Sequence, residues 1–292
     1  MNRYNSIHRQ QLFHWIGKHI DDRMAGKSLT DSLRSDYVAC LEGALENGLW
    51  LKTPRLPDCL GDGSLIKVHR PIVCFTEWSL GQSLPHTTRY GRLALGFPKR
   101  FVLSRGGQPV TYVRDLKKGD PYSAGLMRFA RFFKMARATN ILDAAVRDEL
   151  ADRFDYLSHF AKRLRKEPAP PGAVPVRRRR PSKSRARAMA REPDPFTRRY
   201  GETLHYLEER EWRIVHDASL AEHFRKGPFG PRSPHLPQYY LPFEPGRELF
   251  TVVLPDNRTV SMVMEKKRLF RKLFPSDAPH VTILSLQDIG TF

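Results

Sequence analysis

The sequence predicts an α+β fold with a mostly antiparallel central sheet and flanking helices, and three observations support this prediction. Short apolar stretches with the composition of strands recur between residues 71 and 286. Two longer stretches carry apolar residues at the spacing of one helix face. With 292 residues, 40% of them hydrophobic, the chain can also bury a sizeable core. We therefore expect a globular α+β chain.

The first part of the chain predicts one clear helix. An apolar run around His14 comes first, and a histidine beside Phe and Trp is most often a hydrogen-bonded core residue. Helical spacing then extends over residues 30–47, with Thr30 or Ser28 as the expected cap. Gly48 is expected to end this helix, because glycine adopts the backbone conformation of a helix C-cap without strain.

The middle of the chain predicts alternating strands and loops. The expected elements are strands at 71–76, 92–97 and 108–113, a helical turn at 98–103 and a tight turn at 105–107. The first strand is continuously apolar and so fully buried, whereas the second alternates loosely, as a half-buried strand does. The glycines match neither a Walker loop nor a dinucleotide-binding motif, so no phosphate cradle is expected.

The second half of the chain predicts helices, one long loop and two further strands. The expected elements are helical structure at 123–164, a proline-rich loop at 226–246, a strand at 249–254, a basic helix at 263–274 and a last strand at 280–286. Methionine and aromatic residues at helical spacing are far more often a core face than a cofactor site.

The composition favours a cytoplasmic protein. The N-terminus lacks the apolar core of a signal peptide, and no apolar run approaches the ~20 residues of a membrane span. The three cysteines, Cys40, Cys59 and Cys74, are an odd number without the spacing of a metal site. We therefore expect reduced thiols, no metal and no membrane contact.

The net charge of +19 is concentrated in one segment. Lys162 to Arg199 holds fourteen Lys or Arg and three Asp or Glu, a net charge of +11. Low hydrophobicity and many prolines predict a disordered insertion at 166–199, between an N-terminal part (1–165) and a C-terminal part (200–292) of one domain. The candidate nucleic-acid-binding residues are Arg177, Arg178, Arg179, Arg180, Lys183 and Arg185. A solvated linker is the alternative, because no aromatic residues interleave these arginines to stack on bases.

Residues 204–215 combine dense charge with a strand-like end. As a strand, they would place Glu209, Glu211 and Arg213 on one face and turn Trp212 and Ile214 toward the core. Two carboxylates steadied by an arginine suit a cationic or hydroxylated ligand. The alternatives are a charged helix with solvated acids, or a strand in which Arg213 forms a salt bridge to either glutamate.

Short motifs also follow one another in a recognisable order. They are Leu12-Phe13-His14, Leu45 to Leu49, Val73 to Leu80, His86, Tyr90-Gly91, Leu95-Gly96-Phe97, Lys99, Pro109 to Val113 and Glu209 to Arg213. In this order and spacing the chain resembles the AbiGi family of abortive phage-resistance proteins, over nearly its whole length except the arginine-rich insertion. The resemblance implies phage defence, and the family name carries the description antitoxin.

Two hypotheses for the chemistry remain open. The first is an ADP-ribosyltransferase-like enzyme, which gathers a His, a Tyr and a Glu from successive strands around NAD. Here His14, Tyr90 and Arg213 would hold NAD, Glu211 would stabilise the oxocarbenium ion as nicotinamide leaves, and Glu209 would act as base. This likeness is an analogy at the level of the fold. The second hypothesis is a non-catalytic, basic, nucleic-acid-binding antitoxin or regulator with an operon-encoded partner protein.

Overall fold

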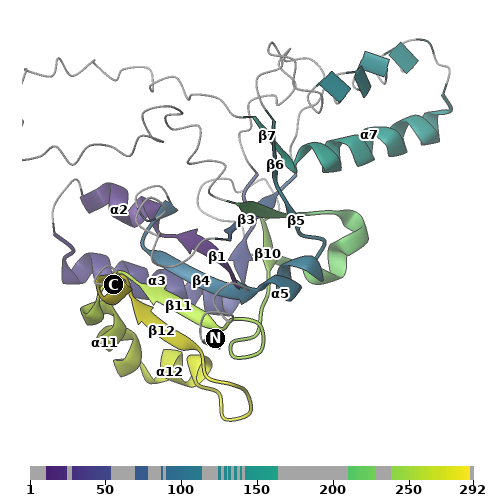
Figure 1. Ribbon diagram of the computed structural model, residues 1–292. Helices are drawn as coiled ribbons and strands as arrows, with labels where there is room; N and C mark the ends of the chain where they lie inside the picture. The colour runs from purple at the N-terminus through teal and green to yellow at the C-terminus, as the bar shows by residue number, and fades with distance from the viewer. Residues whose placement is uncertain are drawn as a thin grey trace, which may run out of the picture.

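The computed structural model describes most of the chain outside the arginine-rich segment (Figure 1). The described residues are 11–24, 28–53, 70–77, 87, 90–113, 142–163, 210–227 and 238–289, with short pieces between 124 and 139. The predicted insertion at 166–199 lies outside these residues.

A seven-stranded sheet lies at the centre of this part of the chain (Figure 1). In spatial order its strands are β12 (Thr282–Ser285), β11 (Thr251–Leu254), β4 (Leu93–Pro98), β1 (Gln11–Ile16), β3 (Ile72–Thr76), β8 (Glu211–Val215) and β5 (Gln108–Pro109). β11 and β12 run parallel, and the other neighbouring pairs are antiparallel. The fold is therefore α+β with a mixed, mostly antiparallel sheet, as predicted.

Helices and two small sheets surround this central sheet. The helices are α2 (Lys18–Met24), α3 (Asp31–Asn47), α5 (Lys99–Leu103), α7 (Ala144–Ser158), the 3-10 helix η3 (Ala218–His223), α11 (Asn257–Glu265), α12 (Lys267–Leu273) and α13 (Leu286–Ile289). One small sheet has the order β2 (Leu49–Trp50), β10 (Gln238–Leu241), β9 (Arg225–Gly227), and the other pairs β6 (Thr111–Val113) with β7 (Ala161–Arg163). Within the described residues, no helix has the length and apolar character to cross a membrane.

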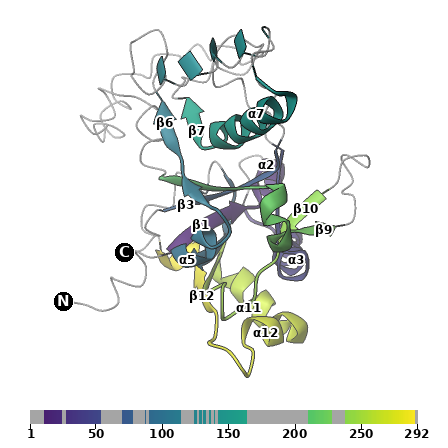
Figure 2. The same cartoon turned by 90° about the vertical axis from the view of Figure 1, so that its right-hand side faces the viewer.

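The main core fills the space between one face of the central sheet and three helices. Sheet residues such as Phe75 and Leu95 pack there against Leu41 of α3, Val263 of α11 and Leu269 of α12, all of them fully buried. Figures 1 and 2 both show α11 and α12 at one end of the molecule and α7 at the opposite end. The two ends therefore present separate surfaces.

The helix expected at 30–47 is confirmed as α3. The side chain of Thr30 accepts a hydrogen bond from the backbone N–H of Leu33, which satisfies one of the free donors at the helix start. Gly48 ends the helix with a φ of 92°, in the left-handed region that glycine adopts without strain. A side chain there would also meet the backbone of Leu241, so both the conformation and the close approach require glycine.

The strands expected at 71–76, 249–254 and 280–286 are confirmed as β3, β11 and β12, and the helical turn at 98–103 as α5. The half-buried strand expected at 92–97 is instead buried on both faces of β4, because Leu93, Leu95 and Phe97 pack in the main core and Ala94 packs in a second cluster on the other face. Small residues, Ala94 and Gly96, occupy its second face, and their low hydrophobicity gave the false impression of alternation.

Four other predicted elements differ in the structure. The expected strand at 108–113 is divided into β5 and β6, and the expected helical stretch at 123–164 ends at Ser158 and is followed by β7. The expected loop at 226–246 contains strand residues of β9 and β10. The expected basic helix at 263–274 begins earlier and consists of two helices, α11 and α12. Lys266 has an extended backbone, with a ψ of 96°, and separates α11 from α12. This break lets Val263 and Leu269 face the same core. In one continuous helix, two residues six positions apart would point in different directions.

Candidate functional site

The predicted alternation of β8 is confirmed. Ile214 is fully buried in the main core, where Trp212 also packs. On the opposite face, Val215 packs against Ile72 and Phe160. Glu211 and Arg213 lie on this second face with Val215, because alternate residues of a strand share a side.

Glu211 and Arg213 form a buried ion pair. Arg213 Nε donates to Glu211 Oε1 over 2.7 Å, and the two side chains are only 3% and 6% exposed. Arg213 also donates through Nη1 to the backbone carbonyl of His159, the residue that ends α7. The salt bridge considered from the sequence is thus present for Glu211. The hydrogen bond from Arg213 to the His159 carbonyl connects the central sheet to the C-terminus of α7.

Arg70 makes a second connection between the sheet and α7. Its guanidinium bonds Asp155 at 2.9 Å, Asp217 at 2.6 Å and, through Nη2, Asp152. It also lies 5.8 Å from the ring centre of Tyr156. Burial raises the pKa of the Asp217 carboxyl, but the hydrogen bonds from Ser219 and Arg70, with the charge of Arg70, together lower it below its ordinary value. Because two of these acids come from α7, Arg70 holds this helix against the sheet.

Replacing Arg70 with Gln is expected to release α7 locally rather than to unfold the chain. Gln cannot make three charged contacts at once, and partly exposed ion pairs contribute about 1 kcal/mol or less each. Hydrogen exchange of the α7 amides should therefore accelerate, while exchange in β1 and β4 stays slow. The exposed pair Arg247–Glu244 offers the control: Arg247→Gln should leave α7 exchange unchanged. Unchanged α7 exchange in Arg70→Gln would contradict this role.

His14 lies on the opposite face of the sheet from Glu211. The registers place Phe13 beside Thr76 and Thr76 beside Glu211, so these three share one face. His14 follows Phe13 and points the other way, with its ring 5.8 Å from that of Phe75 in the main core. Its Nδ1–H donates to the Cys74 carbonyl at 2.7 Å. Burial lowers the pKa of His14 to about 4, so the imidazole is neutral at neutral pH.

Tyr90 packs on the face that carries Glu211, but against Phe13 and Trp15 of β1. His14 therefore lies on the opposite face of the sheet from Tyr90 and Glu211. Glu209 lies outside the described residues, as do the six basic residues proposed for nucleic acid. The catalytic and binding roles of all these side chains remain predictions.

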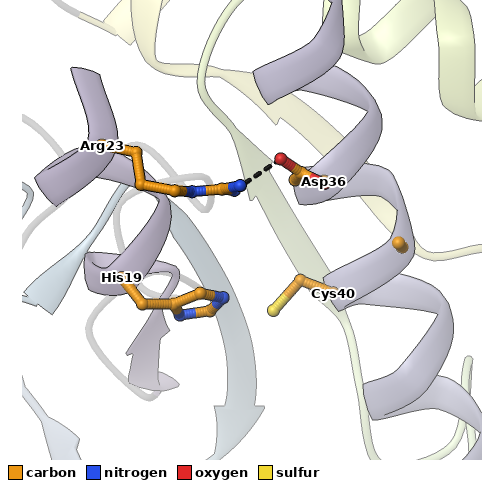
Figure 3. Close-up of a pocket in the computed structure, with 5 residues that line it drawn as sticks. His19, Arg23, Asp36 and Cys40 are labelled. Carbon is orange, nitrogen blue, oxygen red and sulfur yellow. Dashed lines mark hydrogen bonds and ion pairs between the residues drawn. The ribbon is translucent and has the colours of Figure 1, made fainter.

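A shallow pocket lies between α2 and α3 (Figure 3). His19 and Cys40 point toward one another across it, and Arg23 forms an ion pair with Asp36 at its edge. A Cys beside a His can act as a nucleophile only as the thiolate. Burial raises the pKa of the Cys40 thiol to about 11, so it stays protonated at neutral pH. No group of three or more potential metal-binding side chains occurs within the described stretches. The pocket therefore does not resemble a catalytic centre.

An exposed apolar surface at the α7 end was not predicted from the sequence. Its members are Phe129 (42% exposed), Phe132 (54%), Met135 (54%), Val146 (47%) and Leu157 (60%). They are five of the nine large apolar side chains that are exposed in the described part of the chain. Figures 1 and 2 both show the short helical pieces beside α7. The apolar spacing at 123–164 predicts a core face, but periodicity alone does not distinguish a covered helix face from an exposed one.

A stacked pair of aromatic rings joins one of the short helical pieces to α7. The rings of Phe129 and Phe154 stack with centres 5.2 Å apart, and Phe154 is buried. Val146 and Leu157 are eleven residues apart on α7, about three helical turns, so they lie along one side of it. The ion pairs of Arg70 with α7, and the hydrogen bond from Arg213 to the His159 carbonyl, attach this helical structure to the sheet.

One comparison with known proteins gives a match, and this match covers part of the chain. Residues 58–156 match the model of a family described as "Putative abortive phage resistance protein AbiGi, antitoxin". No curated protein and no solved structure gives a significant match. The matched stretch contains Arg70, β3, β4 and four of the five members of the apolar surface. Over residues 58–156, the resemblance to the AbiGi family that the sequence motifs indicated is therefore confirmed.

Proposed function

We propose that this protein is the non-catalytic antitoxin of a two-component abortive infection system and that it acts by binding a toxin protein. One observation carries the proposal: the apolar surface coincides with the stretch that matches a family described as antitoxin. An antitoxin requires a toxin as partner, and a protein partner requires a surface to bind. The surface around α7 meets this requirement.

The physical chemistry of the apolar surface favours a protein partner. Large apolar side chains gathered on one exposed surface are uncommon on monomeric proteins and mark interaction sites. Fully burying one such side chain contributes about 1.5–3 kcal/mol. Exposed charged residues of both signs surround the surface, with Arg128 and Arg131 in one segment and Asp148 and Glu149 in α7. An apolar centre with a polar rim is the usual arrangement of a protein interface.

The position of the predicted catalytic residues supports a non-catalytic role. Glu211 forms a buried ion pair with Arg213 inside the fold. His14 lies on the opposite face and donates to the backbone of β3. A transferase would need these groups on one open cleft around NAD.

The test is whether this protein neutralises the expected toxin, the protein encoded by the neighbouring gene. Expressed alone, that neighbour should arrest growth, and co-expression of this chain should restore it. Val146→Asp/Leu157→Asp should abolish rescue, because two buried and unpaired carboxylates at an interface cost several kcal/mol. The melting temperature should stay unchanged, since both positions are exposed in the free protein. Leu103→Asp is the matched control, an equally exposed leucine in α5 that should leave rescue intact.

Two results would contradict the antitoxin proposal. One is full rescue by Val146→Asp/Leu157→Asp, which would separate the apolar surface from neutralisation. The other is consumption of NAD by the wild-type protein together with its loss in Glu211→Gln under conditions where circular dichroism shows that the variant is folded. Gln keeps the shape of the side chain but removes the negative charge that a developing oxocarbenium ion needs. That second result would favour the ADP-ribosyltransferase hypothesis instead.

A further inference from the structure

We infer that the outward face of α12 binds single-stranded nucleic acid. This inference goes beyond the proposed antitoxin function and can fail without it. It depends on a different part of the molecule, because α12 lies at the end opposite α7 in both views (Figures 1 and 2). The residues that carry it are Lys267, Phe270, Arg271, Phe274 and His280, which we call the basic aromatic face.

The helix geometry divides α12 into two sides. Leu269 and Leu273 are fully buried in the main core. Lys267, Phe270 and Arg271 are spaced three and four residues apart, so they lie together on the other side. All three are exposed, and Phe270 keeps 41% of its surface accessible. Phe270 and Arg271 each lie one helical turn from Lys267, so an exposed phenyl ring and two cations lie on this part of the helix.

Three aromatic rings contact one another on this face, and two of them are stacked. The ring centre of Phe270 lies 4.8 Å from that of Phe274, with an angle of 30° between the planes. The ring centre of His280 lies 5.4 Å from that of Phe274, with the two planes tilted by 58°. Phe274 is partly buried, so its stacking contact with one face of the Phe270 ring limits the motion of that ring. A supported ring of this kind can stack on a base at low entropic cost.

The cations of this region fall into two groups. Lys266 pairs with Glu42 at 3.2 Å, and Arg268 and Lys272 pair with Glu46, so three of the five hold α12 against α3. Lys267 and Arg271 have no ion pair within the part of the chain that the structure describes. Lys267 lies one helical turn from Phe270, and Arg271 follows Phe270 in the chain. Their charges are therefore available to an anionic ligand.

These features together favour single-stranded nucleic acid among polyanions. Lys267 and Arg271 can contact successive backbone phosphates, while Phe270 offers a flat surface to a base. Stacking needs an unpaired base, which a duplex does not expose. The net charge of +19 adds general attraction for polyanions. An anionic membrane would use the charges too, but a single exposed ring provides little apolar area for insertion.

The inference is tested by fluorescence anisotropy with the full-length protein and two labelled probes. One probe is a pyrimidine 20-mer, as DNA and as RNA, and the other is an abasic strand of the same length and charge. The wild type should bind the base-containing probes about fivefold or more tightly than the abasic strand, the size expected for stacking of one base. Phe270→Ala should remove this difference and leave abasic binding unchanged. Comparison of DNA with RNA shows whether the sugar is also recognised.

Two double variants distinguish the loss of charge on the basic aromatic face from the same loss of charge elsewhere on the protein. Lys267→Gln/Arg271→Gln should weaken binding to all probes and reduce its dependence on salt. Arg147→Gln/Arg153→Gln removes the same charge from α7 and should have a smaller effect. Equal wild-type affinity for base-containing and abasic strands would overturn the inference. So would binding to anionic phosphatidylserine vesicles that Phe270→Ala abolishes while binding to oligonucleotides stays intact.

Discussion

Arg213→Met is expected to destabilise the folded chain by about 3–5 kcal/mol, the largest effect of any single substitution considered for this protein. The substitution keeps most of the side-chain volume but removes the guanidinium that bonds Glu211 and the carbonyl of His159. Glu211 is 5% exposed and would then lose its buried counter-charge. Desolvation of a carboxylate without that compensation costs several kcal/mol. Urea unfolding followed by tryptophan fluorescence and by circular dichroism measures the loss.

A double-mutant cycle separates the ion pair from other effects of the substitution. Glu211→Gln/Arg213→Met should be more stable than the sum of the two single changes predicts, because each single change leaves an unmatched buried charge. Arg247→Met is the matched control, since its side chain is 59% exposed beside Glu244. Exposed pairs contribute about 0–1 kcal/mol, so this variant should unfold near the wild type. Unfolding of Arg213→Met at the wild-type urea concentration would show that the buried pair contributes no stability.

The sequence predicted the strands best where local patterns were strong. Residues 71–76 and 249–254 are continuously apolar, and both are strands of the central sheet. The alternation of Trp212 and Ile214 with Glu211 and Arg213 also predicted which side chains face the core. Prediction was poorer where neighbours decide the structure. β7 and β10 each pair with strands far away in the sequence, and nothing within their few residues distinguishes them from a helix end or a loop.

The functional surfaces were harder to predict for the same reason. Arg70 meets acids that are 82, 85 and 147 residues away, and sequence spacing gives no sign of such contacts. His14 and Glu211 belong to strands that the sequence identified, yet only the register shows that they lie on opposite faces. The apolar surface depends on exposure, which is a property of the complete fold. The sequence therefore predicts which residue types are candidates for a site, but it does not predict which of these residues lie close together in the folded chain.

Acid is expected to destabilise the fold through His14, by up to about 3 kcal/mol between pH 6.5 and pH 4. Burial lowers the pKa of His14 to about 4 from its ordinary 6.5, and the nearby charge of Lys52 lowers it further, while the hydrogen bond to Cys74 opposes the shift. Within this range the unfolded chain binds a proton at His14 and the folded chain does not. Stability from this group is therefore fully present above pH 6.5 and is lost as the pH falls toward 4.

His14→Asn tests this expectation, because Asn has no charged form and its amide can still donate to the Cys74 carbonyl. Urea midpoints from pH 7 to pH 4 should fall less steeply for His14→Asn than for the wild type. Some slope should remain, since burial also lowers the pKa of His159 and of His216. His280→Asn, at an exposed histidine, is the control and should keep the wild-type slope. Identical slopes for His14→Asn and the wild type would mean that His14 takes up its proton in the folded state as readily as in the unfolded chain.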